Sequence, residues 1–228
     1  MRKEELRAIA GRIDHTNLRP DVVLSGIERL CAEAVEYGFY SVCVAPAYIR
    51  KAAVFLSGSD VKVTTVVGFP LGFTLASVKV YESLEAMMCG ADEIDVVMNI
   101  SRAKEGDWGY VEKELNSIVL ATGDLVRKLI IETGYLNDAE IATASEAAVA
   151  GGADFVKTST GFGPRGASLG DIGLIKDTVG GRVSIKAAGG IRDLGTVREF
   201  IDAGADRIGT SSGAEIMREA AGGTGPHS

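Results

Sequence analysis

The sequence predicts a single (β/α)8 TIM barrel, in which eight parallel strands close into a sheet inside a ring of helices. Two patterns lead to this prediction. Short aliphatic runs alternate with longer amphipathic segments along the whole 228-residue chain, and eight such pairs can be distinguished. The aliphatic runs also lack a polar face, which is typical of parallel strands in a sheet that helices cover. Eight strand–helix pairs in a chain of this length indicate the barrel.

The expected elements alternate strictly along the chain. Strands are predicted at residues 12–15, 40–45, 62–67, 93–98, 128–132, 154–157, 183–188 and 207–209. Helices are predicted between them, at residues 21–37, 47–56, 75–89, 108–122, 138–150, 169–179, 194–203 and 211–219. A doubly wound open sheet would show the same alternation, although that fold usually has fewer strands. We expect one barrel domain over residues 1–220 and a flexible, glycine-rich tail over residues 221–228.

A short internal repeat supports the closed barrel. The tripeptide Gly-Ala-Asp recurs at residues 90–92, 152–154 and 204–206, each time between a predicted helix and a predicted strand. The three copies precede the fourth, sixth and eighth strands, and alternate strands of a barrel contribute to the same interior layer. We therefore expect the sixth residue of each copy to face one interior layer, and these residues are Asp95, Lys157 and Gly209.

The composition argues against several classes of protein. A formal net charge of −7 disfavours nucleic acid or an anionic membrane as the main partner. The cysteines Cys31, Cys43 and Cys89 include no close-spaced pair, so no disulfide framework or zinc site is indicated, and Cys43 is expected to be a packed core thiol. No signal peptide is visible and no apolar run approaches the roughly 20 residues that span a bilayer. We expect a cytoplasmic protein with no membrane contact.

Charged residues stand at or near the ends of five predicted strands. In a barrel, the carboxyl ends of the strands converge on the face where active sites lie. One such charge could simply reach solvent, but five favour mutual neutralisation as the reason for keeping them there. These residues are Asp14, Asp95, Glu132, Lys157 and Lys186.

Two of these charges, Lys157 and Lys186, belong to neighbouring predicted strands. Like charges that lie close together disfavour double protonation, and burial acts in the same direction. One lysine should therefore have a lowered pKa and a free amine near neutral pH, and such an amine attacks carbonyls to form a Schiff base. The alternative is that each lysine only pairs with a carboxylate such as Asp95 or Asp14.

Two glycine-rich stretches have the composition of phosphate-binding loops. AAGGIRD, residues 187–193, and GTSSGAE, residues 209–215, each follow a predicted strand and precede a helix. Glycine lets the backbone approach an anion, and a helix N-terminus supplies free N–H groups, although ordinary turns and caps use the same residues. Thr16 and Thr158 lie beside charged strand ends, where their hydroxyls either bind a substrate or cap the chain. The loop STGFGPRGAS, which follows Lys157, has the glycines to close over a ligand.

Five motifs together closely resemble the deoxyribose-phosphate aldolase family, in that family's order and from Asp14 to about Ser212. They are RIDHTNL, VVGFPLG, DEIDVVMNI, DFVKTSTGF and SIKAAGGIRD. The resemblance implies a TIM barrel and a class I aldolase that needs no metal or other cofactor. It also implies the reaction, which is the reversible cleavage of 2-deoxy-D-ribose 5-phosphate to acetaldehyde and D-glyceraldehyde 3-phosphate.

The resemblance also implies roles for individual residues. Lys157 matches the Schiff-base lysine, Lys186 the lysine that lowers its pKa, and Asp95 the group that moves protons through water. Some relatives carry a terminal tyrosine that assists proton transfer, whereas this sequence ends in GTGPHS, so water or another group would serve instead. The resemblance and the motifs described above together give the expected substrate-binding residues, which are Asp14, Thr16, Thr158, Gly189, Gly190, Gly209, Ser211 and Ser212.

Two other functions fit the same motifs. One is a lysine aldolase or an isomerase that acts on a different phosphosugar, because paired lysines do not choose the aldehyde. The other is a non-catalytic phosphosugar-binding barrel, which would need the phosphate loops but would gain nothing from a buried amine. The expected partners are a small phosphosugar and an aldehyde, and a homodimer or higher homo-oligomer is possible.

Overall fold

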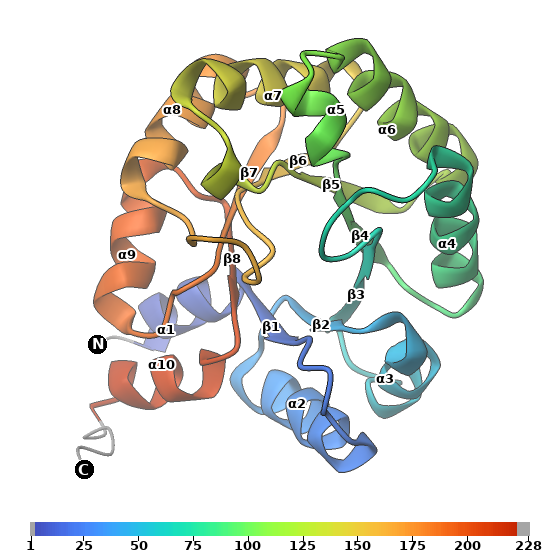
Figure 1. Cartoon of the computed structure of the whole chain (residues 1–228). Coiled ribbons are helices and arrows are strands. Elements are labelled where there is room, and N and C mark those ends of the chain that lie inside the picture. The colour runs from blue at the N-terminus through green and yellow to red at the C-terminus, as the bar shows by residue number, and fades with distance from the viewer. Residues whose placement is uncertain (1–2, 223–228) are drawn as a thin grey trace.

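Eight parallel strands close into a barrel in the computed structural model, which describes residues 3–222 (Figure 1). Each strand pairs with the next one along the chain, and the first pairs with the eighth, so the predicted closed barrel is confirmed. The larger part of the expected tail lies outside the described residues. The strands are β1 (Ile13–Asn17), β2 (Ser41–Val44), β3 (Lys62–Val67), β4 (Glu93–Val97), β5 (Val126–Ile130), β6 (Phe155–Lys157), β7 (Ser184–Ala188) and β8 (Arg207–Thr210).

The helices surround the barrel (Figure 1). Those that match the predicted segments are α2 (Leu24–Tyr37), α3 (Ile49–Phe55), α4 (Ala76–Met88), α6 (Trp108–Thr122), α7 (Asp138–Ala150), α8 (Leu169–Val179), α9 (Leu194–Ala203) and α10 (Gly213–Ala220). Three short elements were not predicted: α1 (Lys3–Ala10), α5 (Ile100–Lys104) and the 3-10 turn η2 (Thr133–Tyr135), whereas the 3-10 turn η1 (Pro46–Tyr48) falls at the start of the helix predicted at residues 47–56. The three span eight residues or fewer, too short for a clear periodic pattern. No helix in the described part of the chain is long and apolar enough to cross a membrane.

The aliphatic core lies between the barrel and the helices, whereas the inside of the barrel is polar. Val42, Val44 and Val156 belong to the buried hydrophobic core together with residues such as Ile27 and Ile172 of the helices. Buried polar and charged residues alternate with these aliphatic positions along the strands; they include Asp14, Ser41, Thr64, Glu93, Asp95, Lys128, Lys157, Lys186 and Arg207. Because the outer layer supplies the hydrophobic stabilisation, the interior is left for chemistry.

The Gly-Ala-Asp repeat sets the register of neighbouring strands. Its glycines end the preceding helices with φ angles of 98°, 85° and 120° at Gly90, Gly152 and Gly204, a region that favours glycine. Each aspartate then makes two hydrogen bonds to one residue of the preceding strand. Its carboxylate accepts the backbone N–H of that residue, and its own backbone N–H donates to the carbonyl of that residue. The pairs are Asp92 with Val63, Asp154 with Arg127, and Asp206 with Ile185. The repeat therefore fixes β4 on β3, β6 on β5 and β8 on β7.

Replacing Asp206 with alanine tests this role. The carboxylate of Asp206 accepts the Ile185 N–H at 2.8 Å, and its loss leaves that donor without its partner. We expect Asp206→Ala to lower the free energy of unfolding by about 1 kcal/mol. Asp206→Asn keeps an acceptor oxygen and should lose less than half as much. Urea denaturation measures both, and equal losses for the two variants would contradict the role of the hydrogen bond.

Candidate active site

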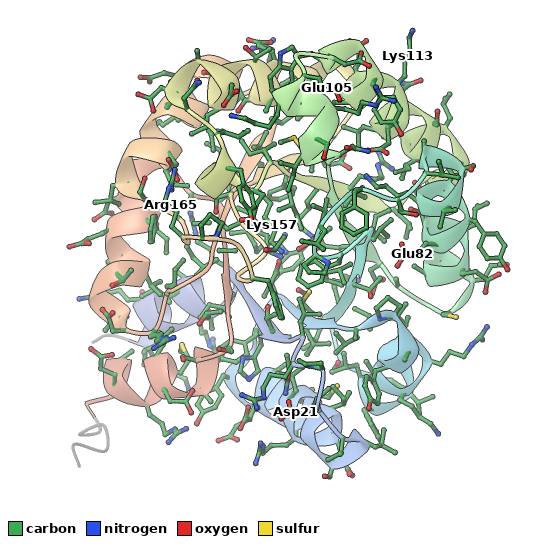
Figure 2. The ribbon with its side chains drawn as sticks, viewed as in Figure 1. Asp21, Glu82, Glu105, Lys113, Lys157 and Arg165 are labelled. Carbon is green, nitrogen blue, oxygen red and sulfur yellow. The ribbon has the colours of Figure 1, made fainter. Side chains whose placement is uncertain are left out.

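A cavity of about 800 Å³ opens at the carboxyl ends of β1, β6, β7 and β8. Lys157 lies near the middle of the barrel, whereas the exposed Lys113 of α6 extends from its outer rim (Figure 2). Six of the residues predicted for the site line this cavity, and they are Thr16, Lys157, Gly189, Gly190, Gly209 and Ser211.

Below the cavity, Lys186 holds two carboxylates together. Its Nζ lies 2.7 Å from Asp95 Oδ2 and 2.5 Å from Asp14 Oδ2. The second oxygen of Asp14 accepts a hydrogen bond from Arg207 Nη1 at 2.8 Å. Asp14 is completely buried and does not line the cavity, so it does not contact a ligand there directly.

A second chain of charges leads from the same aspartate back to Arg207. Lys128 Nζ lies 2.9 Å from Asp95 Oδ1 and 2.6 Å from Glu93 Oε2. Glu93 Oε2 in turn lies 3.3 Å from Arg207 Nη1. The two chains therefore close into a ring of alternating charge inside the barrel. We name this the interior charge ring, and its members in order are Asp95, Lys186, Asp14, Arg207, Glu93 and Lys128.

Lys157 is attached to this ring but is not part of it. Its Nζ donates to Asp95 Oδ2 at 2.8 Å, and that oxygen also accepts the hydrogen bond from Lys186. The ring contains three cations and three carboxylates, so a protonated Lys157 would be a fourth cation beside them without a carboxylate of its own. Losing the proton from Lys157 restores the balance.

The pKa values of Lys157 and Lys186 shift in the directions that this charge balance predicts. Burial lowers the pKa of Lys157, and the charge of Lys186 lowers it further, while Asp95 opposes both. Burial also acts against the charge of Lys186, but Asp14 and Asp95 outweigh it and raise the pKa of Lys186. Of the two lysines, Lys157 is therefore the one that loses its proton more readily. Both lysines also pair with carboxylates, as the alternative interpretation of the sequence expected.

Two carboxylates of the ring, Asp95 and Asp14, have lowered pKa values. Burial alone would raise the pKa of Asp95, but Lys128, Lys157 and Lys186 hold it well below its usual range. The pKa of Asp14 is lowered in the same way by Lys186, Lys128 and Arg207, again against burial. Asp95 is thus a fixed negative charge between the two lysines.

Several residues of the site were not predicted from the sequence. Glu93, Lys128 and Arg207 complete the ring. Their side chains point into the barrel, and the residues two positions further along each strand face the same way. Cys43 is buried as expected, but it lies near the charges of the ring and outside the hydrophobic core cluster. Burial and the charge of Asp95 raise the pKa of Cys43 to about 11, so the thiol stays protonated at neutral pH.

Besides Asp14, two predicted substrate-binding residues, Thr158 and Ser212, do not line the cavity. The hydroxyl of Thr158 donates to the carbonyl of Ala188 at 3.3 Å and accepts the Ala188 N–H at 3.1 Å, so it joins β6 to β7. Ser212 precedes α10, and its N–H donates to the Thr210 hydroxyl at 2.9 Å. Both residues shape the backbone beside the cavity.

One end of the cavity has the properties of an anion site. Gly189 and Gly190 adopt left-handed φ angles of 88° and 80°, which let the backbone after β7 turn sharply along the cavity. Ser211 lies just before the N-terminus of α10, and the exposed side chain of Arg192 lines the same cavity. Backbone N–H groups, a helix N-terminus and a guanidinium together suit a phosphate group.

Glu132 anchors the loop that follows Lys157. It is the single non-glycine residue with positive φ, at 39°, within residues 3–222, and its side chain is buried. Its carboxyl group accepts hydrogen bonds from the backbone N–H and the hydroxyl of Thr160, and burial raises its pKa. Two residues further on, Phe162 lines the cavity and packs edge-on against Phe69 of the β3–α4 loop, with ring centroids 5.3 Å apart. Glu132 thus supports a loop that lines the cavity, and it lies outside the interior charge ring.

Truncating Glu132 should loosen this loop. We expect Glu132→Ala to speed amide hydrogen exchange in a peptide that covers residues 158–163 by about tenfold, because a lost anchor of roughly 1.4 kcal/mol corresponds to that factor. Peptides from β2 and β3 should exchange at the parent rate. Glu132→Gln keeps an acceptor oxygen and should stay close to the parent. Uniformly faster exchange over the whole chain would contradict a local anchor.

Within residues 3–222, no group of three or more His, Cys, Asp and Glu side chains is arranged to hold a metal ion. A closed barrel with a buried, low-pKa lysine at the floor of its carboxyl-end cavity defines the class of lysine-dependent barrel enzymes.

Comparison with known proteins identifies the family within this class. The chain belongs to the DeoC/LacD family of aldolases, because the model described as DeoC/LacD family aldolase matches residues 8–219. A deoxyribose-phosphate aldolase of Streptococcus mutans is 51% identical over 205 residues, which cover 90% of this chain and 93% of that protein. The resemblance seen in the sequence motifs is therefore confirmed.

Solved structures agree with this assignment. The aldolase QR15 has a TM-score of 0.90 and 45% identity, over 94% of this chain and 96% of that chain. A deoxyribose phosphate aldolase from Aeropyrum pernix, whose structure is described as uniquely tetrameric, has a TM-score of 0.87 and 32% identity, over 94% of this chain and 92% of that chain.

Proposed function

We propose that this chain catalyses the reversible aldol cleavage of 2-deoxy-D-ribose 5-phosphate to acetaldehyde and D-glyceraldehyde 3-phosphate, through a Schiff base on Lys157. The observation that carries the proposal is the shared carboxylate oxygen of Asp95, which holds the amines of Lys157 and Lys186 side by side beneath the cavity. The deoxyribose-phosphate aldolases of similar sequence support the choice of substrate.

The first step is nucleophilic attack by the uncharged amine of Lys157 on C1 of the open-chain sugar. The attack gives a carbinolamine, and protonation of its hydroxyl lets water leave, so that an iminium ion remains. Lys186, whose pKa is raised, is a protonated neighbour that can supply this proton. A general acid in such a position typically contributes about 10²–10⁴ in rate.

The second step breaks the bond between C2 and C3. A base removes the proton of the C3 hydroxyl, D-glyceraldehyde 3-phosphate leaves, and the electron pair of the broken bond passes to the iminium to give a neutral enamine. Protonation at C2 and hydrolysis then release acetaldehyde and return the free amine. Because the low pKa of Asp95 makes it a poor proton store, it acts by holding water and Lys186 in place.

The phosphate group fixes the orientation of the sugar. The glycine turn of Gly189 and Gly190 and the N-terminus of α10 next to Ser211 hold it at the end of the cavity, with Arg192 as the counter-charge. Binding energy at the phosphate is thereby converted into positioning of C1 over Lys157. Thr16 and Gly209 line the same cavity.

Two finer properties belong to the same proposal. We infer that the chain works in the cytoplasm and as a homo-oligomer. The tetrameric relative from Aeropyrum pernix supports self-association, and the three unpaired cysteines are typical of a reducing compartment.

Borohydride trapping tests the Schiff base directly. Incubation with acetaldehyde and reduction should leave an ethyl group on Lys157, which peptide mass spectrometry locates. Lys157→Ala should lose both the adduct and the cleavage of deoxyribose 5-phosphate while keeping the parent circular dichroism spectrum. The matched control Lys113→Ala removes an exposed lysine of α6 and should keep both. A folded Lys157→Ala variant that turns over normally would refute the assignment, and a parent without any adduct would favour the non-catalytic phosphosugar-binding barrel.

The dependence of kcat/KM on pH tests the role of Lys186. Because only the uncharged Lys157 attacks, kcat/KM should rise as the pH passes upward through the pKa of Lys157. Lys186→Met removes a cation next to Lys157 and leaves Asp95 and Asp14 less balanced, so the pKa of Lys157 should rise. The acidic limb of the profile should then move to higher pH. Lys51→Met, an exposed lysine of α3, is the matched control and should keep the parent profile. An unmoved limb in Lys186→Met would show that the two lysines are not coupled.

A further inference from the structure

We propose that Glu93 and Arg207, which lie deep in the barrel and do not line the cavity, are positioning residues that control how readily Lys157 acts as a nucleophile, by setting the charge balance of the interior charge ring. This inference rests on the proposed function for the identity of the nucleophile. It adds two residues that contact neither Lys157 nor the cavity.

Arg207 is the point where the two arms of the ring meet. One arm runs from Asp95 through Lys186 to Asp14, and the other runs through Lys128 to Glu93. Nη1 of Arg207 lies 2.8 Å from Asp14 Oδ1 and 3.3 Å from Glu93 Oε2, so one nitrogen joins both arms.

The surroundings hold Arg207 in this place. Its guanidinium stacks on the ring of Tyr40 at 3.4 Å from the centroid and lies 5.3 Å from that of Phe155. Arg207 and Glu93 are both buried, so bulk water and salt screen their charges weakly. A change of charge at Arg207 or Glu93 therefore changes the electrostatic potential at Asp95, although other side chains of the ring lie between.

The sign of the effect follows from the charge count. Removing the charge of Arg207 leaves three carboxylates facing two cations in the ring, and the excess negative charge favours a protonated Lys157. Removing the charge of Glu93 leaves three cations facing two carboxylates, and the excess positive charge favours the free amine. The two substitutions should therefore act in opposite directions on one property of Lys157.

The other charged and titratable groups near Lys157 stay unchanged in these variants. Asp95 of β4 accepts a hydrogen bond from Lys157, and Lys186 of β7 donates to the same oxygen of Asp95. Cys43 of β2 and Glu132 after β5 lie close enough to interact electrostatically with Lys157. None of them is replaced. A shift of the pH profile would therefore report the far end of the ring.

The experiment measures two pH profiles for each of four proteins: the parent, Arg207→Met, Glu93→Gln and the double variant. One profile is kcat/KM for deoxyribose 5-phosphate, and the other is the rate of borohydride trapping with acetaldehyde. At pH 6, on the acidic limb, we expect Arg207→Met to be about three- to tenfold slower than the parent and Glu93→Gln to be faster. The double variant removes one charge of each sign and should return toward the parent. Arg207→Lys keeps the charge and should lie close to the parent.

An exposed ion pair provides the matched control. Arg182→Met and Glu146→Gln make the same changes of charge at a pair whose side chains are 48% and 51% exposed, and neither should move the profiles. Shifts in one direction for both ring variants, or unmoved limbs, would overturn the inference. Borohydride trapping distinguishes failure of this inference from failure of the proposed function. A parent protein that forms the adduct but does not cleave deoxyribose 5-phosphate would refute the proposed substrate. Shifted trapping profiles would still support the influence of the interior charge ring on Lys157. If Arg207→Met does not fold, Glu93→Gln and the double variant still give the sign and its reversal.

Discussion

The whole site depends on one constraint, which is that buried charges have to balance. Taking seven ionisable side chains out of water costs several kcal/mol for each ion unless partners compensate it. Six of them compensate one another in the interior charge ring, where three cations alternate with three carboxylates. Lys157 is the seventh, and the ring has no carboxylate left for it. The ring therefore favours the uncharged form of Lys157, which is the form that the proposed mechanism needs.

The barrel makes this ring possible because it brings together residues that are far apart in the sequence. The members of the ring come from β1, β4, β5, β7 and β8, and Asp14 and Arg207 are separated by 193 positions. The register that places them is held by the Gly-Ala-Asp repeat, whose aspartates attach even-numbered strands to the strands before them. The aliphatic layer between strands and helices supplies the stability, so the interior can hold charges that would not stabilise a core.

The sequence predicted the strand-end charges and the fold, but it missed half of the ring. Asp95, Lys157 and Lys186 were found because they stand near the ends of strands. Glu93 and Arg207 stand at the start of their strands. The Gly-Ala-Asp repeat nevertheless indicated that they face the barrel interior. Its fourth position lies two residues before the sixth, so both side chains point to the same side of the strand. That position holds Glu93, Phe155 and Arg207, and Arg207 does lie beside Phe155. Lys128 belongs to no repeat, and its partners depend on how the barrel closes, which no local pattern encodes. The short helices α1 and α5 were missed because a few residues carry little periodicity.

The same charge count bears on the carbon–carbon cleavage of the proposed mechanism. In the free protein, Lys157 removes the excess positive charge by giving up its proton. A protonated Schiff base on Lys157 restores that excess, and loss of its N–H proton would give a neutral imine, which is a poorer electron sink. While the iminium keeps that proton, the excess charge disappears when the bond between C2 and C3 breaks, because the electron pair that moves to the iminium gives a neutral enamine. The neutral ring thus disfavours the charged intermediate relative to the enamine that follows it. The balance that frees the amine of Lys157 for attack is therefore also the balance that favours cleavage.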